Sequence, residues 1–444
     1  MFSRFSRAGS SGRRPTSPDL VPAWTCLDSG DLPGALRLLR QAGTAPLAEV
    51  ALVVGRAAGT AGFDDLRTAA ATLAAHPDRP RALYDYGYAC VERGVSYLAI
   101  PALREALRLT GGSAGVLREL VSAYEDEGRH RDAADALLAH ESGLLDWPDR
   151  YLLVHNALLS GDLELARRQH ALLPAPDDDL WRGAHDRQTR MLRRAASARE
   201  AGPLDGTDLR GWQFVLGGTV LGTLSPYGFD AGMSGRWAWL QDTYDQCLAG
   251  LVRLRAVLDA AGVRARSVSL LPDRDSRILG LAAAEVLGLP AEPFEAGRQD
   301  TVVVAYDLGG TAGHPQGELV LEQLRERVPG QVLHEHASCW TDPPPVAADS
   351  VTLLHQSVVA PWAGGLRQGA DGGVEQGEPD ARPEEEIAAA VVGAGPEPAE
   401  GDGRTPADPV EGPASFVTVV RDAWLRGDRD AVRSSGPVGS SRFL

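Results

Sequence analysis

Two short segments of the chain hold the residue types that bind phosphate-bearing ligands. The segment 272–277 places two acids among three donor side chains at the expected start of a helix: Asp273, Arg274, Asp275, Ser276 and Arg277. Backbone N–H groups at a helix N-terminus, together with arginine, hold phosphate well. The segment therefore predicts a ligand-binding loop, and its two acids are candidates for catalysis.

The second segment follows shortly after and begins with Asp307, a third candidate catalytic acid. Gly309, Gly310 and Thr311 come next, and glycines allow a backbone to approach a ligand closely. Both loops must be brought together by the fold to act as one site.

The elements around these loops predict how they are positioned. Short apolar strands at 266–271, 301–306, 331–336 and 350–360 alternate with helices at 277–288 and 318–327. This order is typical of an α/β domain with a mostly parallel sheet, here 209–364, in which ligands bind at the carboxyl ends of the strands. The stretch 212–224, with Gly217-Gly218 at its centre, predicts a β-hairpin at the start of the domain, followed by one long helix at 235–261.

The two loops and their strands resemble part of the type I phosphoribosyltransferases. In that family a strand and turn bind pyrophosphate, and a later hydrophobic strand ending in two acids binds the ribose. Here the strand at 302–305 is followed by Tyr306 and Asp307, so one acid is missing, and the small-residue loop is displaced in register. The resemblance implies either an enzyme acting on phosphoribosyl or other phosphate-bearing substrates, or a non-catalytic relative of that fold.

Histidines near the end of the 331–336 strand are candidates for a metal site. His334 and His336 would share one face of the strand with Cys339 close behind, and His355 or His314 would complete a zinc set. Strand-end histidines more often face solvent, so neither a metal nor another cofactor is predicted.

The first part of the chain shows a repeat. Turn glycines recur at spacings of 32, 32, 34 and 33 residues: Gly30, Gly62, Gly94, Gly128 and Gly161. Five residues after each stands a residue that is small in four cases out of five: Ala35, Arg67, Ala99, Ala133 and Ala166. A period of this length predicts stacked helical hairpins, with looser packing in the second hairpin because of Arg67.

The unit from Pro80 to Gly111 resembles a tetratricopeptide repeat through Leu83, Tyr86, Gly87, Cys90, Ala99, Leu103 and Ala106. The resemblance implies a repeat domain at 19–175 that binds a partner protein on the face formed by the first helix of each hairpin. The matching positions are Arg81, Tyr84, Tyr88, Arg118, Tyr151 and His155, and tyrosine and arginine commonly anchor interfaces. Such a groove would hold an acidic terminus through arginine alone, although Tyr84 and Tyr88 are equally suited to packing between repeats.

Composition excludes several classes of function. All 44 basic residues are arginine, which disfavours Walker-type nucleotide sites, pyridoxal enzymes and protein kinases, each of which needs a lysine. The net charge of -16 disfavours binding to nucleic acid. Without a long apolar run or a signal segment, no membrane partner is expected, and the scattered cysteines fit a reducing cytoplasm.

The remaining segments are predicted to be a disordered arm at 1–18, a helical linker at 176–208 with a helix at 181–200, a disordered acidic linker at 365–412, and a helix at 415–432 within a C-terminal tail, 413–444. The sequence as a whole predicts an intracellular bacterial adaptor. Its repeat groove would bind a protein, and its α/β domain would bind a second partner or a phosphate-bearing small molecule. The alternative is an enzyme on the α/β domain.

Overall fold

The computed structural model describes residues 14–226, 232–368, 373–395, 407–429 and 431–440. These residues form two compact units. The array unit extends to residue 160 and also includes 168–174, and the α/β unit comprises 161–167 and the chain from residue 175 onward. Most of the predicted N-terminal arm lies outside the described residues.

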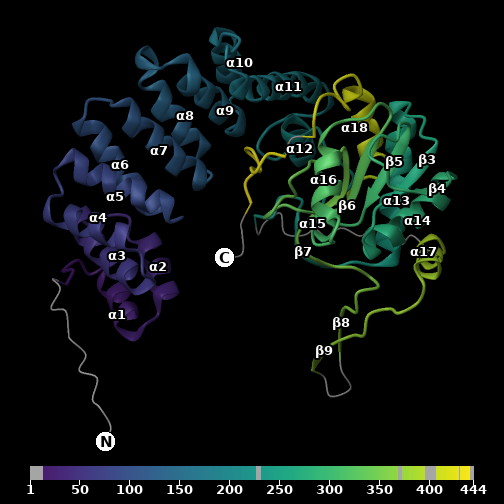
Figure 1. Ribbon diagram of the computed structural model, residues 1–444, viewed down its shortest axis with the longest axis horizontal. Helices are drawn as coiled ribbons and strands as arrows, with labels where there is room; N and C mark the ends of the chain where they lie inside the picture. Colours follow the sequence, from purple (N-terminus) through teal and green to yellow (C-terminus); the bar gives the residue numbers. More distant parts are fainter. Residues whose placement is uncertain (1–13, 227–231, 369–372, 396–406, 430, 441–444) are drawn as a thin grey trace, which may run out of the picture. The chain divides into compact units, whose positions relative to one another are not determined.

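The array unit consists of successive helices joined by short turns (Figure 1). Their bounds are α1 (Val21–Ser29), α2 (Leu32–Gln41), α3 (Leu47–Ala61), α4 (Asp64–Ala75), α5 (Pro80–Glu92), α6 (Ser96–Leu109), α7 (Ala114–Asp126), α8 (His130–Leu138) and α9 (Tyr151–Leu159). The next helix, α10 (Leu163–Leu172), contains the sequence boundary between the units. The predicted helical array is confirmed.

The turn glycines and the small residues play the parts expected of them. All five glycines have φ between 66° and 82°, a left-handed conformation that favours glycine. The four alanines of the repeat are completely buried. The prediction of a loose second hairpin is wrong, because close approach there comes from other residues. A Cβ at Gly55 would lie 3.4 Å from the Ala70 side chain, and one at Gly59 would lie 3.3 Å from the stem of Arg67.

The α/β unit is built on a seven-stranded sheet in which every pairing is parallel. The order β4-β3-β5-β6-β7 continues on the outer side of β7 with β1 and β2. The strands are β1 (Val220–Leu221), β2 (Trp237–Gln241), β3 (Ser267–Leu270), β4 (Ala291–Pro293), β5 (Thr301–Ala305), β6 (Val332–Cys339) and β7 (Ser350–Val359). The four predicted strands are confirmed as β3, β5, β6 and β7, and the first two are buried throughout.

Helices cover both faces of this sheet. On one face, α13 (Tyr244–Ala261) packs on β6 and β7, and α14 (Arg274–Leu287) packs on β3 and β5. The short α15 (Leu308–Ala312) contacts β6 from the other face and is followed by α16 (Gly317–Arg325). Further helices in this unit are α11 (Asp179–Ala201), α12 (Leu209–Gly217), α17 (Glu384–Val392) and α18 (Gly412–Val420).

The predicted β-hairpin at 212–224 is wrong. The residues before Gly217-Gly218 form α12, which begins at an N-cap where Asp208 accepts a hydrogen bond from Gly211 N. Gly218 ends this helix with φ 78°, and β1 then joins the edge of β7. A glycine pair after an apolar run ends a helix as readily as it turns a hairpin, and the Asp208 cap is the local signal that decides between them.

The single helix predicted at 235–261 is also wrong in its first part. Residues 237–241 form β2, which extends the parallel ladder along β7, and α13 begins only after Thr243 caps it by accepting from Gln246 N. Tertiary pairing with β7 overrides the helical reading of this apolar stretch.

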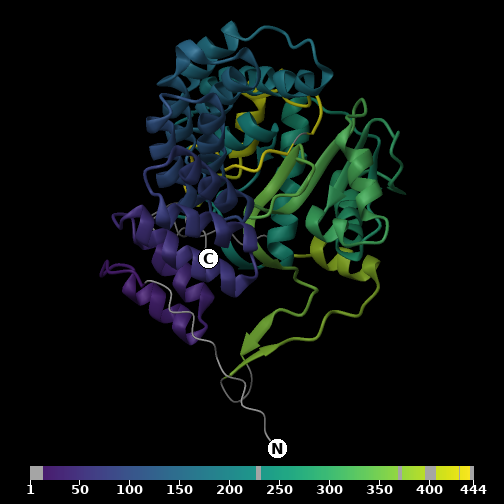
Figure 2. The same ribbon diagram turned by 60° about the vertical axis from the view of Figure 1, so that its left-hand side comes forward.

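The stretch 365–412, predicted to be unfolded, contains regular structure in its described parts. Strands β8 (Leu366–Gln368) and β9 (Val374–Gln376) form a separate antiparallel pair (Figure 2), and α17 packs on α14. Asp408 is buried between Arg210 and Arg253, at 2.7 and 3.1 Å. The last helix, α18, is Gly412–Val420 instead of 415–432. Within the described residues, no helix is long and apolar enough to cross a membrane.

Candidate functional site

The partner-binding residues predicted on α5 remain accessible. The rings of Tyr84 and Tyr88 stack with centroids 6.3 Å apart, and Tyr88 is 45% exposed. Arg81 forms an ion pair with Asp85, one turn along the same helix, at 2.8 Å. The aromatic pair, not the arginine, is therefore the feature that this part of the array offers to a partner.

The partner-binding residues predicted on the later helices form contacts within the array itself. Arg118 on α7 donates to both oxygens of Asp149, at 2.6 and 3.2 Å, and Asp149 is only 2% exposed. Tyr151 is buried and stacks on both Trp147 and His155. These contacts connect the last helices of the array to one another.

The tyrosine pair is surrounded mainly by acids, with one arginine, Arg81, 6.0 Å from the centre of the Tyr84 ring. Burial and the nearby carboxylates of Glu92 and Asp126 raise the pKa of Glu119 above its usual value. Burial and the charge of Glu119 raise the pKa of Tyr84. We call Tyr84, Tyr88, Glu92 and Glu119 the tyrosine–acid face. Because Arg81 and Arg118 are paired with acids of the array itself, the charges do not favour an acidic ligand here.

In the α/β unit, the two predicted loops converge. Thr311 Oγ1 donates to Asp273 Oδ2 at 2.8 Å, and Tyr306 N donates to Ser276 Oγ at 3.0 Å. The loops lie at the carboxyl ends of β3 and β5, which are neighbours in the sheet. This is the point where the strand order reverses, and ligands of open α/β sheets bind at such points.

The donors of these loops are nevertheless occupied by the protein itself. Asp273 accepts from Ser276 N and Asp307 accepts from Gly309 N, at 2.9 and 2.7 Å. Leu308 N donates to Glu335 at 2.8 Å. The two arginines contact the region of α17. Arg274 donates to the carbonyl oxygen of Asp380, just before this helix, at 2.8 Å, and Arg277 forms an ion pair with Glu384 at its start.

The three candidate catalytic acids do come together. Burial raises the pKa of Asp275, and the charges of Asp273 and Asp307 add to this effect, although Trp362 Nε1 donates to Asp275 at 2.7 Å. Acids that interact in this way create a negative potential that disfavours a phosphate. Gly310 lies in α15 between the other loop residues and adds no side chain to the cluster.

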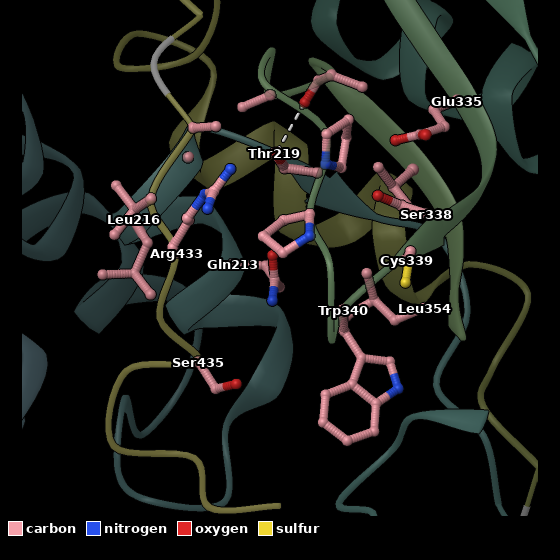
Figure 3. A pocket seen from close by; sticks show the side chains of 18 of the residues that line it. Gln213, Leu216, Thr219, Glu335, Ser338, Cys339, Trp340, Leu354, Arg433 and Ser435 are labelled. Atoms are coloured by element: carbon pink, nitrogen blue, oxygen red, sulfur yellow. Dashed lines mark hydrogen bonds between the residues drawn. The ribbon is translucent and has the colours of Figure 1, made fainter. Parts of the chain in front are cut away.

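A cavity of about 280 Å³ lies beside β6, between α12, the segment after β6 and the C-terminal tail (Figure 3). Glu335, Ser338 and Cys339 line one side, and Gln213 and Arg433 lie across from them. Glu335 is completely buried, which raises its pKa to about 8, and its Oε2 atom has no hydrogen-bond partner within the described residues. Sequence reasoning missed this residue, although an acid inside an apolar strand was a visible signal.

The predicted metal residues have separate surroundings. The ring nitrogens of His334 form hydrogen bonds with the hydroxyls of Ser350 and Thr352, at 3.2 and 3.3 Å. Burial lowers the pKa of this histidine to about 3. Cys339 lies at the cavity instead. His355 pairs with Cys339 in the β6–β7 register, and His314 accepts from Gln316 N in the loop after α15.

His336 belongs to a buried cluster that the sequence did not indicate. Its Nε2 atom lies 2.9 Å from Asp242 Oδ2 and 3.8 Å from Cys247 Sγ. Tyr306 donates to the same carboxylate oxygen at 2.9 Å. Although burial opposes ionisation, His336 holds the pKa of Asp242 below its usual value, whereas burial and Asp242 raise the pKa of Cys247 and Tyr306.

Comparison of the chain with protein-family models and with curated proteins gave no match. The helical array and the parallel α/β sheet therefore stand on the geometry alone.

Proposed function

We propose that this protein is an adaptor whose array unit is a tetratricopeptide-type repeat that binds a segment of a partner protein on the tyrosine–acid face. The observation that carries the proposal is the stacked Tyr84–Tyr88 pair, which is accessible on α5 and is flanked by acids. Exposed tyrosines with little rotamer entropy are typical anchors of protein interfaces.

The chemistry of this face favours a partner segment that carries positive charge. Glu92 and the partly buried Glu119 repel each other when both are charged, as the raised pKa of Glu119 indicates. A guanidinium or ammonium group of a partner would reduce this repulsion. The flat face of a tyrosine ring also attracts cations, most strongly arginine; Tyr84 already has Arg81 6.0 Å from its ring centre, and Tyr88 is the ring that a partner's cation would reach. We therefore propose a basic segment in place of the acidic terminus that the sequence favoured.

For the α/β unit, we propose binding of a small ligand or second partner without catalysis. The cavity beside Glu335 suits a ligand that presents hydrogen-bond donors or acceptors, because the Oε2 atom of this buried carboxyl can form a hydrogen bond with it. The phosphoribosyltransferase alternative receives less support. Tyr306 replaces an acid and bonds to Asp242, the loop N–H groups are used internally, and Arg274 and Arg277 are turned toward other partners.

Selection of random short peptides displayed on phage tests the array proposal on the full-length protein. Peptides selected by the wild type should be rich in arginine or lysine, and Tyr88→Ala should weaken their binding about tenfold or more. Glu119→Gln should weaken it less, and Glu105→Gln, which alters an acid paired with Arg108 on α6, should leave it unchanged. Selection of acidic peptides, or equal binding by Tyr88→Ala, would overturn the proposal.

A further inference from the structure

The cluster around Asp242 brings three different metal-binding atoms together in the interior of the α/β unit. Asp242 follows the end of β2, Cys247 lies in the first turn of α13, and His336 lies on β6. All three side chains are buried, and their ligand atoms lie within 4.8 Å of one another, which no other group of three His, Cys, Asp or Glu side chains within the described residues does.

The separations of these atoms are within about 0.4 Å of those in a tetrahedral site. The Oδ2–Nε2, Oδ2–Sγ and Nε2–Sγ distances are 2.9, 3.3 and 3.8 Å. Zinc–sulfur bonds of about 2.3 Å and zinc–nitrogen or zinc–oxygen bonds of about 2.0 Å place tetrahedral ligands roughly 3.3–3.6 Å apart. A small movement of the side chains would accommodate the ion.

Hydrogen bonding alone accounts poorly for this arrangement. One carboxylate oxygen, Asp242 Oδ2, lies within hydrogen-bond distance of three donors: His336 Nε2, Cys247 Sγ and Tyr306 Oη. An oxygen has two lone pairs, so three donors exceed what it accepts with good geometry. The other oxygen already accepts from Thr243 N at 2.8 Å. A cation bound by Asp242, Cys247 and His336 would remove this excess of donors at Asp242 Oδ2.

The backbone holds the ligands at fixed positions. Asp242 N donates to Val359 O of β7, and Thr243 caps α13, so the ends of β2 and α13 are both anchored. At Gly250, the absence of a side chain lets α13 approach β6, because a Cβ there would lie 2.9 Å from His336 Nδ1. Ligands carried on strands and on a helix start keep their geometry better than ligands on loops.

We propose that Asp242, Cys247 and His336 form a structural site for a borderline-soft divalent cation of the zinc type, with Tyr306 Oη donating a hydrogen bond to the Asp242 ligand. Sulfur, nitrogen and oxygen ligands together favour zinc over magnesium or calcium. As the bonds to the metal form, the thiol of Cys247 loses its proton to solvent, and His336 binds through an unprotonated Nε2 as the neutral tautomer that carries its proton on Nδ1. All three ligand side chains are buried, which keeps a substrate away from the ion, so we expect the ion to stabilise the fold and take no part in a reaction.

Cobalt substitution tests this site in the intact protein. Full-length chain expressed in minimal medium with Co²⁺ should hold about one ion per molecule and show a thiolate-to-cobalt charge-transfer band in the near ultraviolet. Cys247→Ser and His336→Gln should lose the band, whereas Cys339→Ser, a cysteine on β6 outside the cluster, should retain it. Wild type without bound ion, or a band that survives in Cys247→Ser, would overturn the proposal.

A measurement on the wild type alone covers the case in which these variants do not fold. Zinc K-edge absorption of protein expressed with Zn²⁺ should show one sulfur and otherwise nitrogen or oxygen ligands. A spectrum with only light ligands, or with two or more sulfurs, would exclude this site.

Discussion

Among single residues, Glu335 has the most unusual surroundings. Its side chain is fully buried, and only Leu308 N and the Ser338 hydroxyl favour its charged form against this burial. The pKa rises from 4.5 to about 8, so between these values the folded protein binds more protons than the unfolded chain. The free energy of unfolding therefore falls as the pH rises through this window, by at most about 1.4 kcal/mol for each pKa unit.

We predict that Glu335→Gln removes this loss of stability. The amide oxygen of glutamine can still accept from Leu308 N, and no charge has to be buried at high pH. The variant should gain more than about 1 kcal/mol over wild type when the pH is raised from 5 to 8. Denaturant unfolding of both proteins at the two pH values measures this. A difference that does not depend on pH would mean that Glu335 is not protonated in the folded state.

At the scale of helices and strands, the hairpin of α5 and α6 depends on close contact at Gly87. A Cβ there would lie 2.5 Å from Cγ of the fully buried Leu103, which has no space to withdraw. We predict that Gly87→Ala destabilises the array by about 1–3 kcal/mol despite the higher helix propensity of alanine.

The matched control for this prediction is Gly115→Ala on α7. A Cβ at Gly115 meets no atom within 4 Å, so this variant should be unchanged or more stable by up to about 1 kcal/mol. Far-ultraviolet circular dichroism during denaturation of the full-length protein follows both. Equal effects of the two substitutions would show that the contact with Leu103 does not limit the packing.

At the scale of the whole molecule, charge determines how partners are attracted. The chain carries a net charge of -16, and the proposed face is acidic. Attraction between exposed charges is screened within about 10 Å at 0.1 M salt. We predict that the affinity for a basic peptide selected on the array falls at least about fivefold between 0.05 and 0.5 M salt, measured by fluorescence anisotropy. An affinity that does not change with salt would indicate that the tyrosines act without the acids.

The sequence by itself determined the features that depend on local spacing. The helical array follows from turn glycines at a constant period, and the central strands follow from short apolar runs between amphipathic helices. It also placed Asp273, Asp275 and Asp307 at the carboxyl ends of strands, because parallel strands all end at one edge of the sheet, but only the structure showed that β3 and β5 are neighbours.

Only the tertiary structure decided which side chains are paired and which are available. Arg118 looked like an anchor for a partner, but it is paired with Asp149, and Arg274 and Arg277 are used by the segment that includes α17. Asp408 looked like part of an unfolded acidic stretch until the fold buried it between two arginines.

Dependence on tertiary contacts also explains why the sequence did not indicate the cluster around Asp242. Its members are 5 and 94 residues away from Asp242 in the chain, and no local pattern connects them. Their meeting depends on β2 joining β7, a parallel pairing between distant strands, while the local sequence at 235–261 favoured a helix. Local propensity and period determine most of the elements, whereas the pairing of distant strands such as β2 and β7, and the partners of buried charges, depend on long-range contacts that a single sequence does not reveal.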